Sequence, residues 1–176
     1  TSRPEKRKNA VNILGATPLD FSVNGCVQSM ARRLEEAGFT LQSVFAMSSS
    51  IDAIDKAGAA EANLVISSVG LPAAKYLQAQ FGTPYVIGAP FGDFFSPYVF
   101  DALRESIRTG APADVLGTFA QDAPDTAIVG ESVTAKSLAA ALAVGYGIGA
   151  RVICPVEAPD GVLGACDLQL EDEEAI

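Results

Sequence analysis

The sequence contains no histidine and no tryptophan among its 176 residues. Without histidine, a Ser–His–Asp or Cys–His nucleophile system cannot form, and no imidazole is available as a metal ligand. Only three cysteines are present, Cys26, Cys154 and Cys166, and none belongs to a closely spaced pair. This spacing disfavours a disulfide framework and a self-contained zinc or iron–sulfur site. We therefore assign no metal ligand and no catalytic residue from the sequence.

Basic residues are also scarce. Twelve Lys and Arg face 21 Asp and Glu, which gives a net charge of −9. This balance argues against nucleic acid as a partner, because phosphate backbones are bound by clustered basic side chains. The one basic run, residues 3–8, is interpreted as a solvated leader. No apolar run reaches the roughly 20 residues of a membrane span, and no signal-peptide core is visible, so we expect a cytoplasmic protein without membrane association.

Apolar residues, in contrast, make up 49% of the chain. They recur as a β-branched strand, a short loop and an amphipathic helix, with strands predicted at 11–14, 41–47, 63–68, 84–89, 126–129 and 151–155. This alternation predicts an α/β fold: a Rossmann-like parallel sheet with helices on both faces, followed by a second, partial βαβ module. Ligands of such sheets bind at the carboxyl ends of the strands, so the loops after the strands are the candidate site.

The composition changes along the chain and suggests four parts. We assign a leader at 1–8, a four-stranded Rossmann-like domain at 9–112, an aperiodic linker at 113–124 and a partial Rossmann-like module at 125–176. One βαβ unit is a small core to stand alone. We therefore expect the chain to be a piece of a longer protein.

Local signals place the helix ends. The predicted starts are marked by capping side chains or by proline, at Asn24, Ser50 and the pair Ser96–Pro97. The predicted ends are marked by glycine, at Gly38, Gly82 and Gly110. The acidic residues that follow Asp167 are typical of the first turn of a further helix.

Two glycine-containing segments raise the question of a phosphate site. The run Gly145–Gly149 follows a predicted helix and precedes a strand, the reverse of a dinucleotide fingerprint, so its glycines are interpreted as helix-end and turn residues. The segment 130–134 lies between a strand and a helix, where its hydroxyls could meet an anion. Simple capping of that helix by Ser132 or Thr134 is the favoured interpretation.

Loops after the predicted strands converge at one edge of the sheet. Their short polar, glycine and aromatic residues form the candidate ligand-binding set: Thr17, Asp20, Ser48, Ser67, Ser68, Gly70, Pro90, Phe91 and Ser132. Their placement predicts a binding edge but not catalysis, because such residues also make turns and caps. Cys26 leaves two interpretations open, a reactive thiolate at a helix start or an inert, packed side chain.

The order of several short motifs resembles the nitrogenase component 1 type oxidoreductase family. The motifs lie at Val11–Gly15, Leu34–Phe39, Ala62–Val65, Tyr76–Leu77, Phe81–Tyr85 and Phe91–Gly92. Together they resemble the middle Rossmann-like domain of that family, and Thr126 onward resembles the start of its third domain. The family includes nitrogenase-like enzymes such as the dark-operative protochlorophyllide reductase.

The resemblance implies an oxidoreductase that works with a homologous component-1 subunit and an ATP-dependent iron–sulfur reductase. It implies an iron–sulfur cluster or metallocofactor in the full-length protein, none held by this chain, and no activity of this chain alone. In the molybdenum nitrogenase subunit, a cysteine ending the third strand of this domain binds the cofactor. Ser67 stands at the matching position and is a poor ligand for a soft metal, so the resemblance is to nitrogenase-like proteins rather than to molybdenum nitrogenase.

Two functions remain open at this stage. In the first, the candidate loops form one wall of a pocket for a metallocofactor, a tetrapyrrole or another reducible small-molecule ligand, and electrons arrive from clusters elsewhere. In the alternative, two Rossmann-like lobes form a non-catalytic small-molecule-binding or scaffold module. The absence of histidine and of paired cysteines keeps the alternative open.

Overall fold

The computed structural model describes residues 4–21, 25–47, 49–119 and 124–170. Its larger sheet contains β1 (Ala10–Leu14), β2 (Thr40–Val44), β3 (Ala62–Val65), β4 (Tyr85–Ile87) and β5 (Ala113–Asp114). The strands are all parallel and lie in the order β2-β1-β3-β4-β5. Every residue of β1 and β3 is buried, as expected for parallel strands that are covered on both faces.

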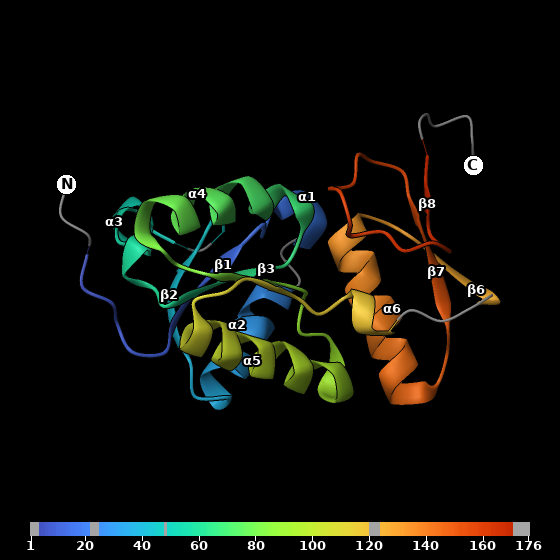
Figure 1. Ribbon diagram of the computed structural model, residues 1–176, viewed down its shortest axis with the longest axis horizontal. Coiled ribbons are helices and arrows are strands. Elements are labelled where there is room, and N and C mark those ends of the chain that lie inside the picture. The colour runs from blue at the N-terminus through green and yellow to red at the C-terminus, as the bar shows by residue number, and fades with distance from the viewer. Residues whose placement is uncertain (1–3, 22–24, 48, 120–123, 171–176) are drawn as a thin grey trace.

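Helices cover both faces of this sheet (Figure 1). On one face, α2 (Cys26–Glu36) and α5 (Gly92–Thr109) contribute Leu34 and Leu103 to the main core around Ile13. On the other face, α3 (Ile51–Asp55) and α4 (Leu71–Phe81) lie together, and Leu77 of α4 joins a second core with residues of β1 and β3. The predicted fold class is therefore confirmed.

A smaller sheet follows in the chain. It contains β6 (Thr126–Val129), β7 (Ala150–Cys154) and β8 (Leu168–Gln169), again parallel and in the order β6-β7-β8. Helix α6 (Ser132–Tyr146) lies between the two sheets (Figure 1). Four short turns complete the described chain: α1 (Pro18–Phe21), η1 (Ala57–Ala59), η2 (Ser68–Gly70) and η3 (Gly117–Phe119). No helix of the described residues has the length and apolar character needed to cross a membrane.

Two short strands were not predicted from the sequence. Strand β5 pairs with β4 inside the segment expected to be a linker, so the larger sheet has five strands instead of four. Strand β8 pairs with β7 directly after Asp167, where sequence reasoning placed no strand, and the acidic residues 171–174 that suggest a helix start lie outside the described residues. Each strand is only two residues long, which is too short to produce a recognisable alternation of apolar and polar residues.

Helix α5 starts a full turn before the position that Ser96 and Pro97 predict. It begins at Gly92, and Pro97 lies inside it. The extra turn places Phe95 at zero exposure in the core, while the Ser96 hydroxyl donates to the carbonyl oxygen of Gly92 at 2.6 Å. Burial of an aromatic side chain therefore outweighs the local start signal.

The predicted helix ends and one predicted cap are confirmed. Gly38, Gly82 and Gly110 all have positive φ, between 68° and 89°, and Gly147 ends α6 in the same conformation. The Ser50 hydroxyl accepts a hydrogen bond from the amide of Ala53 at the start of α3. Asn24 lies outside the described residues.

The basic run before β1 is not simply solvated. The Lys6 ammonium donates to the carbonyl oxygens of Gly58 at 3.0 Å and Ala60 at 2.7 Å, and it also contacts Thr83. The amide of Arg7 donates to the carbonyl oxygen of Ala59. These donors satisfy carbonyl groups of the η1 turn that form no bond within it, and they fix residues 6–7 against the amino end of the sheet.

Candidate functional site

The order in which successive strands are added to the sheet reverses between β1 and β3, which is the topological switch point. The chain runs outward from β1 to β2 on one side and through β3, β4 and β5 on the other. In open α/β sheets, ligands bind beside the carboxyl ends of the strands at this point. The loops that follow β1 and β3 carry four of the predicted residues: Thr17, Ser67, Ser68 and Gly70.

The centre of this edge is closed by the chain itself. The Ser67 hydroxyl is fully buried and donates to the carbonyl oxygen of Gly15 at 2.7 Å. A Cβ atom on Gly70 would lie 2.7 Å from the backbone carbon of Leu14. Ser67 and Gly70 therefore hold the ends of β1 and β3 against each other.

Glu131, a residue that sequence reasoning missed, covers the same edge from the second module. Its carboxylate accepts hydrogen bonds from the amides of Ser68, Val133 and Thr134 at 2.9–3.1 Å. It also accepts from the hydroxyls of Ser132 and Thr134. Glu131 caps α6, so the prediction that Ser132 or Thr134 does so is wrong; Ser132 is the first helical residue and is buried.

Burial by itself would raise the pKa of Glu131. The amides of Thr134, Ser68 and Val133 outweigh that effect and hold the pKa of this carboxyl below its usual value. The carboxylate therefore stays ionised, and it is bound by amides of both modules, Ser68 in the first and Val133 and Thr134 in the second. A glutamate directly before a hydroxyl-rich helix start was the available sequence signal, but hydroxyl residues rank higher as caps.

An open pocket of about 480 Å³ lies beside Glu131. Its wall is mostly apolar and combines the carboxyl end of β6, the first turns of α6, the loop before α5 and α1. The residues that line it are Ile128, Val129, Gly130, Glu131, Thr134, Ala135, Leu138, Phe91 and Asp20. Asp20 and Phe91 are thus the two predicted residues that line this pocket. We refer to it as the apolar pocket.

The other predicted residues lie around the apolar pocket or away from it. Thr17 donates its hydroxyl to Asp20 at 2.5 Å, which orients that exposed carboxylate. Pro90 is buried, and the preceding amide of Ala89 donates to the Ser137 hydroxyl of α6. Ser48 lies outside the described residues.

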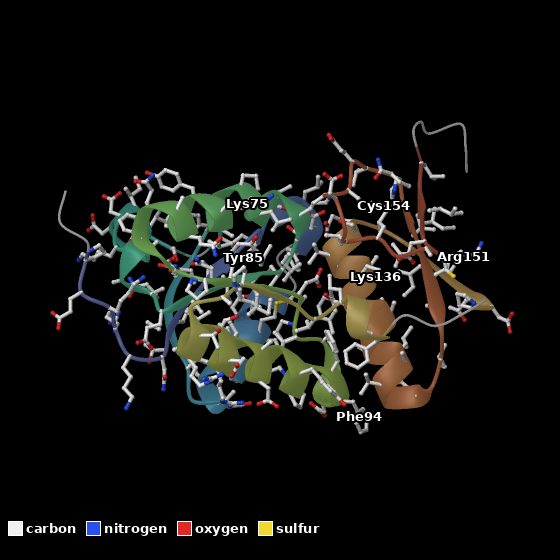
Figure 2. All side chains as sticks on the ribbon, in the orientation of Figure 1. Lys75, Tyr85, Phe94, Lys136, Arg151 and Cys154 are labelled. Carbon is white, nitrogen blue, oxygen red and sulfur yellow. The ribbon has the colours of Figure 1, made fainter. Side chains whose placement is uncertain are left out.

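A second, more polar groove of about 570 Å³ lies on the α4 side of the larger sheet. Lys75 and Tyr85, labelled in Figure 2, line it together with Asp114, Glu157 and Asp160. Burial raises the pKa of Asp114, and the amide of Leu116 and the charge of Lys136 only partly oppose this. Sequence reasoning placed none of these residues in a candidate site.

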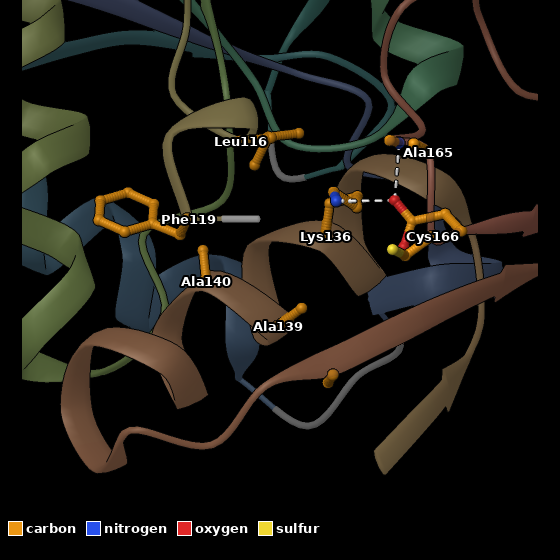
Figure 3. Close-up of a pocket in the computed structure, with 10 residues that line it drawn as sticks. Leu116, Phe119, Lys136, Ala139, Ala140, Ala165 and Cys166 are labelled. Carbon is orange, nitrogen blue, oxygen red and sulfur yellow. Dashed lines mark hydrogen bonds and ion pairs between the residues drawn. The ribbon is translucent and has the colours of Figure 1, made fainter. Parts of the chain in front are cut away.

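Lys136 of α6 and Asp167, which directly precedes β8, form a buried ion pair (Figure 3). Their N–O distance is 2.7 Å, and their side chains are 7% and 4% exposed. Asp167 also accepts hydrogen bonds from the amides of Val152 and Gly164. Burial opposes the charge, but Lys136 and these amides hold the pKa of Asp167 below its usual value. Lys136, Asp167 and Cys166 line a small cavity of about 100 Å³.

Within the described part of the chain, no three Cys, Asp or Glu side chains cluster closely enough to hold a metal ion. The described residues therefore do not fit an iron–sulfur cluster. Burial raises the pKa of Cys26, which favours the packed, inert interpretation of this thiol over a reactive thiolate.

The chain belongs to the nitrogenase component 1 type oxidoreductase family, whose family model matches residues 1–116. The predicted resemblance is therefore confirmed. Relatives include a subunit of the light-independent protochlorophyllide reductase, which agrees with a nitrogenase-like chain. The Nostoc punctiforme protein is 35% identical over 86 residues, covering 48% of this chain and 17% of the relative. The Chloroflexus aurantiacus protein is 33% identical over 114 residues, covering 64% and 21%.

A solved structure of nitrogenase Cp1 at pH 5 has the same fold. It aligns with 96% of this chain and 36% of its own length, with a TM-score of 0.56 and 15% sequence identity. This likeness concerns the fold alone. The chain spans about a fifth of the length of the curated relatives it matches.

Proposed function

We propose that this chain forms one wall of a ligand pocket in a nitrogenase-component-1-like oxidoreductase. The ligand is a tetrapyrrole or a metallocofactor, and the apolar pocket is the surface that receives it. The observation that carries this proposal is the position of that pocket in a chain of this family: it lies where the carboxyl end of β6 meets the loop before α5. Relatives named as subunits of protochlorophyllide reductase support a tetrapyrrole-sized ligand.

The chemistry of the pocket suits binding and shaping. Phe91 and Leu138 offer apolar surface to a flat ligand, and burial of such surface contributes about 25 cal/mol per Å². Asp20 supplies an oriented acceptor at the rim. Glu131 is fully engaged by amide donors, so it maintains the shape of the wall and does not exchange protons with a ligand.

Electrons in this proposal come from iron–sulfur clusters outside the described residues. The partners are a homologous component-1 subunit and an ATP-dependent iron–sulfur reductase, in the cytoplasm. The relatives are themselves named as one subunit of a reductase, which supports a multi-subunit assembly. Ser67, tied to Gly15, contributes to the framework of the edge and not to metal binding.

Protochlorophyllide binding tests the pocket. We expect Leu138→Lys to weaken binding of protochlorophyllide to the purified chain by about tenfold or more, because it places an ammonium against an apolar wall. A fluorescence titration measures the affinity. Tyr76→Lys, at a 61% exposed position on α4, is the matched control and should bind like the wild type.

Equal affinity of Leu138→Lys and wild type would contradict the proposed pocket. In the full-length protein, supplied with the iron–sulfur reductase and ATP, the proposal also expects reduction of the bound ligand. Binding without reduction there would favour the alternative, a non-catalytic binding module.

Iron analysis tests where the metal resides. We expect the chain purified under anaerobic conditions to contain no iron, because its described residues offer no cluster of ligands. Colorimetric iron and sulfide determination measures this directly. Stoichiometric iron and sulfide would contradict the assignment of the clusters to other parts of the protein.

A further inference from the structure

A second cavity continues the apolar pocket along α6. It has a volume of about 290 Å³ and lies between the start of α5 and the second half of α6. We call it the side cleft. Phe91 and Leu138 line both the apolar pocket and the side cleft. Because the two cavities share these walls, one ligand can occupy both.

Three apolar side chains of α6 lie along the side cleft. Leu138, Leu142 and Tyr146 are spaced four residues apart, so they follow one face of the helix. At a rise of 1.5 Å per residue, this wall extends about 12 Å from Leu138 to Tyr146. A cavity of this volume beside a wall of that length suits an extended chain better than a second ring system.

Phe94 supplies the wall on the α5 side. A Cβ atom on Gly145 of α6 would lie 2.9 Å from the Phe94 ring, so the absence of a side chain there admits the ring. The Phe94 ring also meets the Tyr146 ring edge-on, with centroids 6.3 Å apart. Figure 2 shows Phe94 where the start of α5 meets the end of α6. Phe94 and Tyr146 are nevertheless 58% and 72% exposed, so an apolar ligand group would remove both from water.

The two cavities offer no cation to a ligand carboxylate. The described residues that line them include no Lys or Arg, whereas Asp20 and Glu131 line the apolar pocket and Asp93 lines the side cleft. Arg33 of α2 is paired with Asp93 at 2.8 Å. A free carboxylate on the ligand would therefore lie near other carboxylates, whereas an ester of the same group avoids that repulsion.

We propose that the side cleft receives the apolar ester chain of a tetrapyrrole whose ring system occupies the apolar pocket. This inference rests on the proposed function and narrows its ligand class to tetrapyrroles esterified with a long-chain alcohol. A partner chain that covers the side cleft is the competing explanation. It predicts that the affinity for the ligand does not depend on the length of the ester chain.

A series of alkyl esters of protochlorophyllide tests the side cleft. Full burial of one methylene raises affinity about fourfold, and half-burial in an open cleft raises it about twofold. We therefore expect the methyl, butyl and octyl esters to bind the 176-residue chain with increasing affinity, by roughly a hundredfold from methyl to octyl. The free acid should bind no more tightly than the methyl ester. Fluorescence titration below the concentration at which the esters aggregate measures each affinity.

Two variants locate the effect in the side cleft. Phe94→Ser and Tyr146→Ser should each lower the ratio of octyl-ester to methyl-ester affinity by about fivefold, because each removes an aromatic wall. Tyr76→Ser, at a 61% exposed position on α4, is the matched control and should keep the wild-type ratio. Circular dichroism shows whether each variant is folded, and either of the two variants suffices if the other does not fold.

The outcomes separate this inference from the proposed function. Equal affinities for the methyl and octyl esters, or tighter binding of the free acid than of every ester, would overturn the side cleft and leave the apolar pocket in place. An unchanged ratio in the folded Phe94 and Tyr146 variants would do the same. Failure of every ester and of the free acid to bind would overturn the proposed function, and the side cleft with it.

Discussion

Asp167→Ala should lower the free energy of unfolding by about 3–5 kcal/mol, because it leaves an unpaired charge in the interior. The variant leaves the buried ammonium of Lys136 without its partner at 2.7 Å. It also removes the acceptor of the Val152 and Gly164 amides. Urea denaturation followed by circular dichroism measures the effect.

A double variant separates the buried charge from the lost hydrogen bonds. Lys136→Met combined with Asp167→Ala should recover part of the loss, because no unpaired charge then stays in the interior. Asp160→Ala, an exposed carboxylate in the same segment, is the matched control and should change stability by less than about 0.5 kcal/mol. Additive losses in the double variant would contradict the ion-pair explanation.

Glu131→Ala should lower the free energy of unfolding by about 2–3 kcal/mol, because three amides lose their acceptor. Glu131→Gln keeps one acceptor oxygen and should lose about half as much. Hydrogen exchange adds a specific readout, since the amide of Ser68 should exchange faster in Glu131→Ala than in wild type. Glu157→Ala, at an exposed position in another loop, is the control.

The pH dependence of this contribution has a defined sign. The pKa of Glu131 is lower in the folded protein than its ordinary value, which applies to the unfolded chain. The carboxylate therefore stabilises the fold fully above the ordinary pKa of glutamate. This stabilisation is lost as the pH falls from there through the lowered pKa of the folded state. Unfolding curves of wild type and Glu131→Gln should converge over that range, and a constant difference would contradict the explanation.

The sequence was sufficient for the architecture because the relevant signals are local and repeated. The apolar runs around Ile13 and Leu64 predict buried parallel strands, and glycines such as Gly82 mark helix ends by a requirement for positive φ. The two-residue strands β5 and β8 were missed because pairing with a neighbouring strand, and not their own sequence, defines them. The early start of α5 depends on the burial of Phe95, a tertiary effect.

The candidate site was predicted less completely, for a physical reason. Strand order correctly brings Thr17, Ser67 and Ser68 to one edge of the sheet. Sequence reasoning cannot tell which hydroxyls at such an edge form hydrogen bonds with the backbone, as the Ser67 hydroxyl does with the carbonyl oxygen of Gly15. It also cannot locate Glu131 at that edge, because the contact with Ser68 joins residues 63 positions apart.

Helix α6 belongs to two interiors at once. Val133 and Ala140 pack into the main core, whereas Ala135 and Ala139 pack against β7. Because α6 packs into both cores, a tilt of one sheet relative to the other would expose apolar side chains of this helix to water. Phe91 and Leu138 line the apolar pocket from the loop before α5 and from α6, so the width of the proposed binding surface depends on how α6 packs against the larger sheet.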